Sequence, residues 1–197
     1  MGKSADTTLD IHPLIKKRWS PRAFKTDAIE KEKLERMIEA ARWSASCRNE
    51  QPWRFIIGLN QQSPAYDKIF SCLDEGNQVW VKSVPCLILI LMKKTYSHNG
   101  KENKWAKYDC GQAAAYLSIQ ALEEGLYVHQ MAGFNQDKIK KVFRLTDDLE
   151  PVSVIAAGYR DSADILPDDL KKTELAPRKR LPMKELIIES SISSHKI

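Results

Sequence analysis

The chain has 197 residues, 43% of them hydrophobic, which is enough to bury the core of a single domain. Its 31 basic and 26 acidic residues are interspersed, and a formal net charge of +5 is too mild to predict a nucleic-acid partner. The longest apolar run, VPCLILILM, is about half as long as a membrane span, so we expect no membrane partner.

The chain has four widely spaced cysteines, Cys47, Cys72, Cys86 and Cys110. Zinc sites usually contain closely spaced pairs instead. The polar start, MGKSADTTLDIHP, lacks the apolar segment of a secretory signal. We therefore predict reduced thiols, no bound metal and a cytoplasmic protein.

The first expected elements are helical. A polar arm covers residues 1–11, and the sequence HPLI begins a short helix that Pro21 stops. Asp27 and Glu30 have the spacing of a capping box, which predicts the start of a second helix. The apolar residues of that helix recur with the period of an amphipathic helix on a core: Leu34, Met37, Ile38 and Ala41.

Strands and helices alternate in the next part of the chain. Residues 53–59 and 86–92 have the pattern of buried strands. Between them, residues 63–73 form an expected helix, and we predict that Gly76-Asn77-Gln78 breaks it.

The longest expected helix covers residues 107–124 and is closed by Gly125. Alanine and apolar side chains cover most of its circumference, which predicts a central, buried helix. Asn135 can cap a short helix after it, and residues 152–159 have the pattern of a further strand.

The last segments are more polar. Residues 161–174 have a polar, mobile-looking composition, and residues 181–188 form a helix or a strand. We expect one domain over residues 12–188 and a polar tail over 189–197. Strands separated by helices favour an α+β or α/β sandwich.

Two stretches carry polar groups suited to a ligand. The sequence RWSPR places Arg18, Ser20 and Arg22 close together, and guanidinium and hydroxyl groups bind phosphate oxygens. The junction SASCRNEQPW has more hydrogen-bond donors and acceptors than a turn requires, on Ser46, Asn49 and Gln51. Such a mixture suits a planar heterocycle. A solvated basic turn and loop capping are the respective alternatives.

Three later features are weaker when each is taken alone. Asn77 in GNQVW can cap a helix or reach a ligand. The glycine of HQMAGF, residues 129–134, allows either a close approach to a ligand or a tight turn. The RKR cluster, with Arg178 and Arg180, can bind an anion or stay solvated.

In order and spacing, these stretches resemble the nitroreductase family of FMN-dependent flavoproteins. The series is RxSxR, SxxNxQPW, GNQxW, DxGxA at residues 109–113, HQMAGF, VIAAGY and RxRLP, and it covers residues 13–186. Its most specific elements are RWSPR and SxxNxQPW taken together. The chain departs from the family at Ala45, where Pro is common, and at Cys47 and Arg48, which occupy positions that are commonly small.

The resemblance implies an α+β, nitroreductase-like fold with a mixed, mainly antiparallel sheet flanked by helices. It also implies an intertwined homodimer, in which the C-terminal segment of each chain extends across the partner. Two FMN molecules would lie in the subunit interface, and the helix over residues 107–124 would lie in the dimer core.

The resemblance also assigns the FMN contacts. Arg18 and Ser20 would hold the phosphate and ribityl end, and Arg22 would lie nearer the pyrimidine edge. Ser46 and Asn49 would contact FMN from the partner subunit. The complete set of implied cofactor-binding residues is Arg18, Trp19, Ser20, Arg22, Ser46, Asn49, Asn77, Gln130, Met131, Ala132, Gly133, Arg178 and Arg180.

The implied activity is reduction of FMN by NAD(P)H at N5, followed by ping-pong reduction of nitroaromatic, quinone or similar flat acceptors. Arg22 would stabilise the reduced flavin. His98 and His129 are isolated in the sequence, and we interpret them as surface or satisfied histidines. The sequence contains no GxGxxG motif, so it does not predict whether NADH or NADPH is the reductant. Two alternatives stay open: a dehalogenase- or dehydrogenase-type flavoenzyme, and a non-catalytic flavin-binding protein.

Overall fold

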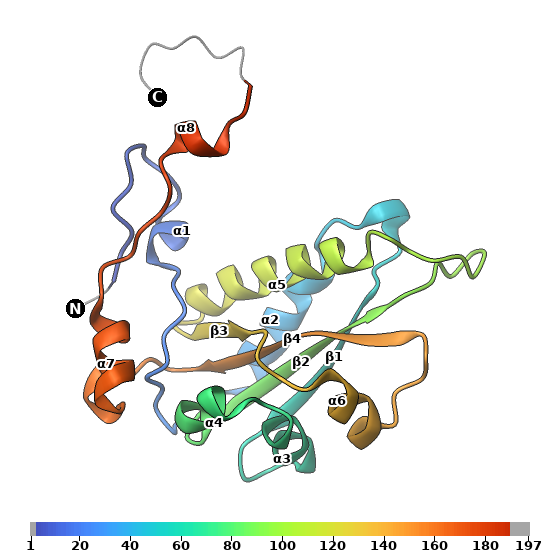
Figure 1. The fold of residues 1–197 in the computed structure, drawn as a ribbon, viewed down its shortest axis with the longest axis horizontal. Coiled ribbons are helices and arrows are strands. Elements are labelled where there is room, and N and C mark those ends of the chain that lie inside the picture. The colour runs from blue at the N-terminus through green and yellow to red at the C-terminus, as the bar shows by residue number, and fades with distance from the viewer. Residues whose placement is uncertain (1–2, 190–197) are drawn as a thin grey trace.

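The computed structural model describes residues 3–189, which form an α+β fold around one sheet (Figure 1). The four-stranded sheet has the order β1-β2-β4-β3, and all three described pairings are antiparallel. The predicted α+β fold is therefore confirmed. The strands are β1 (Trp53–Leu59), β2 (Cys86–Lys93), β3 (Tyr127–Met131) and β4 (Leu149–Gly158).

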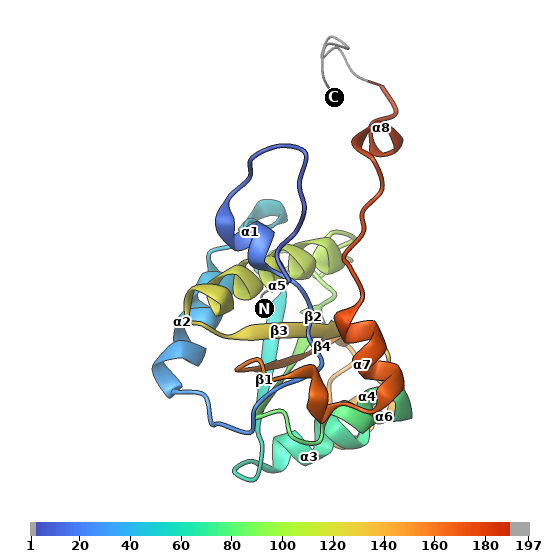
Figure 2. The ribbon, with the colours of Figure 1, turned by 90° about the vertical axis from the view of Figure 1, so that its left-hand side faces the viewer.

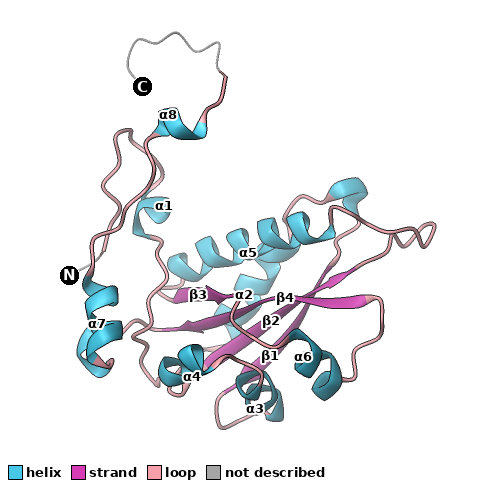
Figure 3. Cartoon of the chain, in the orientation of Figure 1, coloured by secondary structure: helices cyan, strands magenta, loops and turns pink. Residues whose placement is uncertain are grey.

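Helices cover both faces of this sheet (Figure 3). One face carries α2 (Lys31–Arg42) and α5 (Ala106–Glu123). The other carries α3 (Pro64–Ser71), α4 (Glu75–Val81) and α6 (Gln136–Phe143). The remaining helices and 3-10 turns are α1 (Pro13–Lys17), η1 (Cys47–Asn49), η2 (Ala163–Ile165), α7 (Asp168–Leu175) and α8 (Met183–Leu186).

The continuous apolar run of β2 is explained by its central place. Successive side chains of a strand point to opposite faces, so a strand with helices on both sides needs apolar residues at every position. Leu87, Leu89 and Leu91 pack on the α3 side. Cys86, Ile88 and Ile90 pack on the α5 side.

The cysteines are free, as predicted, and three of the four are buried. Burial raises the pKa of the Cys86 and Cys110 thiols to about 12. Such thiols stay protonated at neutral pH and are unreactive.

Helix α5 is buried on one face only within a single chain. Small side chains such as Ala113 and Ala114 face the sheet and α2. On the other face, Tyr108 and Tyr116 are 64% and 49% exposed, and Trp105 just before the helix is 56% exposed. The predicted all-round burial is thus absent within one chain, whose large aromatic side chains remain uncovered.

The predicted helix break at Gly76-Asn77-Gln78 is wrong, because these residues lie inside α4. The preceding helix ends at Ser71, and the chain turns around the buried Leu73. Trp80 and Val81 at the end of α4 are also buried. Their packing outweighs the low helix propensity of Gly76.

The predicted capping box at Asp27 and Glu30 is also wrong. Helix α2 begins at Lys31, and its N-cap Glu30 makes no side-chain cap bond. Ile29 is buried, which favours an extended approach to the helix. By contrast, the Asn135 cap of α6 is confirmed, because its side chain accepts from the Lys138 N–H at 2.8 Å.

Two elements differ from the expectation for their segments. The first half of HQMAGF belongs to strand β3, which pairs along β4. Residues 161–174 contain η2 and most of α7, and are more ordered than their polar composition predicts. The buried side chain of Glu174 accepts from the Arg22 and Ala23 N–H groups and so holds α7 against the body.

Both terminal segments project from the same side of the body (Figure 2). Residues 3–12 return alongside α1, where the Ala5 N–H donates to the Lys16 carbonyl at 2.8 Å. The segment after α7 leads outward through α8 and leaves Leu181 and Leu186 more than half exposed. The predicted tail lies outside the described residues except for its first residue. None of the helices described between residues 3 and 189 is long and apolar enough to cross a membrane.

Candidate functional site

One end of the molecule gathers four of the predicted site residues. Arg18 follows α1, and its Nη1 donates to Ser20 Oγ at 3.2 Å. Arg178 comes from the segment after α7, and its Nη1 donates to the Lys16 carbonyl at 2.8 Å. Arg18, Arg178 and Arg180 line one hollow of about 620 Å³ between the two terminal segments, which Asp6 and several apolar side chains also line. We call Arg18, Ser20, Arg178 and Arg180 the arginine corner.

The arginine corner holds like charges close together. Burial lowers the pKa of the Arg18 guanidinium, and the positive charges of Arg178 and Arg180 lower it further. Burial and the charge of Arg180 likewise lower the pKa of Arg178. Within residues 3–189, the ion pairs of the structure involve none of these three arginines. The corner therefore suits an anion with several oxygens.

Arg22 lies in the same loop, and its backbone is fixed by Glu174. The Arg22 N–H donates to both carboxylate oxygens of Glu174, at 3.0 and 3.1 Å, and the Ala23 N–H donates to Oε1 at 3.3 Å. The guanidinium of Arg22 is close enough to His129 to lower the pKa of that imidazole. Arg22 thus lies between the arginine corner and β3.

The predicted residues after β3 meet Asn77 from α4. The Gly133 carbonyl accepts from Asn77 Nδ2 at 3.0 Å and from the Asp74 N–H at 3.1 Å. A Cβ at position 133 would lie 2.8 Å from Asn77 Nδ2 and 2.9 Å from Asp74 Oδ2. A side chain at position 133 would therefore displace the Asn77 and Asp74 side chains where this backbone approaches α4.

The other predicted residues of this stretch have different surroundings. Gln130 Nε2 donates to Ser118 Oγ of α5 at 3.2 Å. Met131 is buried in the core, whereas Ala132 is exposed. The exposed Ala132 and the half-buried Gly133 are therefore the residues of this stretch that a ligand can approach.

His129, which the sequence left outside the site, lies between its two halves. Its Nδ1 is 2.9 Å from the Pro21 carbonyl, and its ring centroid is 4.8 Å from that of Trp80. Burial lowers its pKa to about 4. The imidazole is therefore neutral at neutral pH, and its Nδ1–H donates to the carbonyl, which can only accept. Its position next to Gln130 is the only signal in the sequence.

Trp19 is buried between the arginine corner and β3. Its ring meets the Tyr127 ring edge-on at 6.4 Å, and the Lys3 ammonium lies 4.8 Å above it. The side chain therefore anchors the RWSPR loop by packing. The predicted contact of Trp19 with FMN stays a prediction.

The predicted residues Ser46 and Asn49 lie in a loop with unusual backbone geometry. Arg48, Asn49 and Gln51 have φ angles of 56°, 56° and 50°. Positive φ is uncommon outside glycine and costs about 1 kcal/mol or more, so the surroundings hold it. The Gln51 N–H donates to Ser46 Oγ at 3.0 Å, which closes the loop on itself.

The positions that depart from the family pattern are also held in place. The Cys47 N–H donates to Asp109 Oδ2 of α5 at 3.0 Å. Cys47 Sγ lies 3.4 Å from the Tyr96 hydroxyl, and this contact raises the pKa of Tyr96. Arg48 is exposed at the tip. The loop therefore leaves Arg48 and Asn49 exposed at the surface of the chain.

The two groups of predicted residues lie at opposite ends of α5. Asp109, in its first turn, holds the loop of Ser46 and Asn49. Trp19 packs on Tyr127, just beyond its last turn. A helix of 18 residues is about 27 Å long. One chain therefore holds the groups too far apart to contact the same part of a small ligand.

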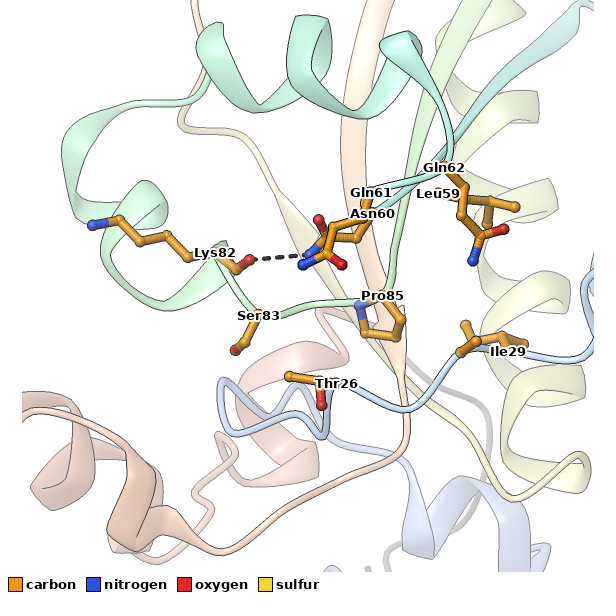
Figure 4. Close-up of a pocket in the computed structure, with 10 residues that line it drawn as sticks. Thr26, Ile29, Leu59, Asn60, Gln61, Gln62, Lys82, Ser83 and Pro85 are labelled. Atoms are coloured by element: carbon orange, nitrogen blue, oxygen red, sulfur yellow. Dashed lines mark hydrogen bonds between the residues drawn. The ribbon is translucent and has the colours of Figure 1, made fainter.

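A larger hollow, of about 700 Å³, lies elsewhere (Figure 4). In it, Asn60 Nδ2 donates to the carbonyls of Lys82 and Val84 at 3.1 and 3.2 Å. It contains none of the predicted site residues, and Lys82 is the single titratable side chain among the described residues that line it. The arginine corner and the end of β3 are therefore the better candidate.

The sequence profile of the nitroreductase family matches residues 15–71 and 57–159. The chain belongs to the nitroreductase family. Its fold superposes with a TM-score of 0.88 on a crystal structure described as an oxidoreductase containing FMN, with 33% identity over 95% of this chain and 96% of the other. The resemblance inferred from the motifs is thus confirmed.

Curated proteins similar in sequence to this nitroreductase-family chain have diverse names. An iodotyrosine deiodinase of Thermotoga neapolitana is 24% identical over 90% of this chain and 96% of its own. A protein of Methanothermobacter thermautotrophicus, provisionally named an NADH dehydrogenase/NAD(P)H nitroreductase, is 25% identical over 77% and 78%. Family membership alone therefore leaves the electron acceptor open.

Proposed function

We propose that this chain is an FMN-dependent oxidoreductase. The observation that carries the proposal is the arginine corner, in which three arginines line one hollow and form no ion pair with a carboxylate of the described residues. Repulsion between these charges is relieved when an anion such as the FMN phosphate binds. The FMN of the 33% identical structure supports the same cofactor.

The residues of the chain fit the two ends of FMN. Arg18, Arg178 and Arg180 would hold the phosphate, with Ser20 as a further polar contact. Arg22 would lie towards the pyrimidine edge, where a cation stabilises negative charge. Asn77 already donates its amide N–H to Gly133, so its Oδ1 remains to accept from a flavin N–H.

FMN held there would supply the redox chemistry between NAD(P)H as reductant and nitroaromatic, quinone or similar flat acceptors. The provisional name of the archaeal relative supports NAD(P)H as reductant. The protein's part is to bind and orient. Neutral His129 fixes the loop backbone at Pro21 and, being uncharged, adds no further cation beside Arg22. The predicted cytoplasmic location stays a prediction.

We also propose a homodimer in which each FMN contacts both chains. Ser46 and Asn49 lie the length of α5 away from the arginine corner of their own chain. A partner related by a two-fold axis across α5 would bring them to the other chain's corner. The exposed Tyr108 and Tyr116 on α5, and Leu181 and Leu186 beyond α7, supply apolar surface for this contact.

The experiment is to purify the protein and record its absorption spectrum, then add NADH or NADPH without oxygen. We expect bound FMN, bleaching by at least one nicotinamide, and reoxidation by a nitroaromatic or a quinone. Steady-state rates with varied reductant and acceptor should give the parallel lines of a ping-pong mechanism. A colourless protein that does not take up added FMN contradicts the proposal.

A dehalogenase-type activity is the second candidate, favoured by the deiodinase relative whose whole length the chain nearly covers. The discriminating measurement is release of iodide from an iodinated phenol by the chemically reduced protein. Iodide release without turnover of NAD(P)H favours this candidate. Flavin that binds but that no nicotinamide reduces, with no iodide release, favours a non-catalytic flavin-binding protein.

A further inference from the structure

Glu174 is a buried acidic residue that neither the motifs nor the family profile bring forward. It lies near the end of α7, beyond the profile match, and is 5% exposed. Burial of a carboxylate is unfavourable unless hydrogen bonds replace its hydration. Here the replacement comes from the RWSPR loop, through the N–H groups of Arg22 and Ala23.

The bonds of Glu174 are made to backbone, so they fix the path of the loop itself. The Arg22 N–H is shared between both carboxylate oxygens. No rotation of the Arg22 side chain can satisfy these bonds, and no other described side chain accepts from these two N–H groups. The position of the Arg22 Cα, and with it the reach of the guanidinium, therefore depends on Glu174.

The same junction also fixes the arginine corner. The Lys3 ammonium donates to the Glu174 carbonyl at 2.5 Å, and the Lys3 carbonyl accepts from Arg178 Nη1 at 3.1 Å. The Lys16 carbonyl accepts from Arg178 and from the Ala5 N–H. Three segments meet here: the N-terminal residues 3–5, the site loop at 16–23 and the chain at 174–178.

We propose that Glu174 is a positioning residue for the flavin site, which sets the RWSPR loop before the cofactor binds and couples it to the segment that carries Arg178. This proposal rests on the proposed function, because it takes FMN as the ligand. A preset loop spares the ordering of these residues upon binding. Loss of the carboxylate leaves two backbone donors without an acceptor and frees the loop.

The test is Glu174→Gln, which keeps the size of the side chain and one acceptor oxygen but places an NH₂ group against the Arg22 N–H in place of the other oxygen. We expect the Kd for FMN to rise about tenfold, from fluorescence titration of the apoprotein. The midpoint potential of bound FMN should shift to a more negative value, because the Arg22 cation is no longer held at its place. Amide hydrogen exchange over residues 20–24 should be faster in the apoprotein, which reports on the loop without any cofactor.

The matched control is Glu32→Gln, on the exposed side of α2, which should change none of the three measurements. If Glu174→Gln does not fold, Glu174→Asp keeps the charge on a shorter side chain and should raise the Kd less. Unchanged Kd, potential and exchange in either folded variant overturn the proposal. If the wild-type protein does not bind FMN, the proposed function and this role fail together. If the wild-type protein binds FMN and the variants give the same Kd, potential and exchange, this role fails alone.

Discussion

Single residues of the arginine corner are oriented without being neutralised. Arg178 is held by two backbone carbonyls, and Arg18 by a hydroxyl. Carbonyl and hydroxyl acceptors fix the direction of a guanidinium but carry no net negative charge. The positive charge is therefore left for a ligand, and the chain bears the repulsion until the ligand binds.

Replacement of Arg18 by Met should weaken FMN binding strongly. A hydrogen bond to a charged group contributes roughly 1.5–3 kcal/mol, so the Kd should rise about tenfold to a hundredfold. Titration of apoprotein with FMN measures this. Lys179→Met is the control, because Lys179 lies between the two C-terminal arginines, is exposed and makes no recorded side-chain bond. Equal losses in both variants would mean that overall charge, not the corner, attracts the cofactor.

His129 should make stability depend on pH. Its pKa is about 4 in the folded chain and about 6.5 when unfolded, so only the unfolded chain takes up the proton between these values. Stability is then complete above pH 6.5 and falls by up to about 3 kcal/mol as the pH drops to 4. Urea unfolding from pH 4.5 to 7.5 measures this.

The comparison variant for that experiment is His129→Asn, which retains an N–H donor and does not titrate. It should be less stable than wild type at pH 7.5 because the ring contact with Trp80 is lost. The difference between the two proteins should shrink towards pH 4.5. A difference that stays constant over the whole range would exclude His129 as the source.

What the sequence predicts at this scale depends on how local the pattern is. Arg18, Ser20 and Arg22 fall within five residues, so RWSPR predicts a phosphate contact directly. His129 and Glu174 act on the same loop from 108 and 152 positions away. An isolated His and a Glu in a polar helix carry no local signal, and only the fold reveals their partners.

At the scale of elements, the site depends on the contact between β3 and α4. The chain leaves β3, and Gly133 passes against Asp74 and Asn77 at the start of α4. The buried Trp80 ring of the same helix lies tilted against the His129 ring of the strand, with the centroids 4.8 Å apart. The helix and the strand therefore hold Asn77 and Gly133, which the family resemblance assigns to the flavin ring, as one unit.

Gly133→Ala should disrupt this unit. The added Cβ would lie 2.8 Å from Asn77 Nδ2 and 2.9 Å from Asp74 Oδ2, so the backbone or both side chains have to move. We expect a loss of about 1–3 kcal/mol in the free energy of unfolding, together with weaker FMN binding. Gly76→Ala in α4 is the control: no atom lies within 4 Å of its Cβ, so stability should hold or rise by up to about 1 kcal/mol. If both variants unfold alike, the close contact at Gly133 does not matter.

Burial and long-range strand pairing explain which elements the sequence predicts and which it does not. The unbroken apolar run of β2 predicts a strand with two covered faces, and the structure has it. Gly76-Asn77-Gln78 predicts a break by local propensity, yet burial of Trp80 and Val81 keeps the helix. Strand β3 has only five residues, and HQMAGF has the local pattern of a turn, so its pairing with β4 is visible only in the fold.

For the whole molecule, the exposed face of α5 is the main unsatisfied feature. Trp105, Tyr108 and Tyr116 lie on one side of this helix, each about half exposed or more. Large aromatic groups gathered on one surface mark an interaction site. The family resemblance predicts that this surface is the dimer core. That prediction also gives Ser46 and Asn49 a ligand, which a single chain does not.

Tyr108→Glu should therefore produce a monomer that loses FMN. A charge in the centre of an apolar interface lacks a partner in either chain, and its desolvation opposes association. Sedimentation velocity measures the oligomeric state, and absorbance of the same sample measures the flavin. Lys141→Glu, at an exposed position of α6 across the sheet from α5, also makes the net charge more negative but lies away from this surface, so it should leave both readouts unchanged.

The two readouts should change together because the site is divided between chains. Each arginine corner would keep its own phosphate contacts in the monomer but lose Ser46 and Asn49 of the partner. The Kd for FMN should then depend on protein concentration, since association restores the missing contacts. A Tyr108→Glu monomer that retains FMN with the wild-type Kd would place the whole flavin site in one chain, and the loop of Ser46 and Asn49 would need another explanation for its three left-handed residues.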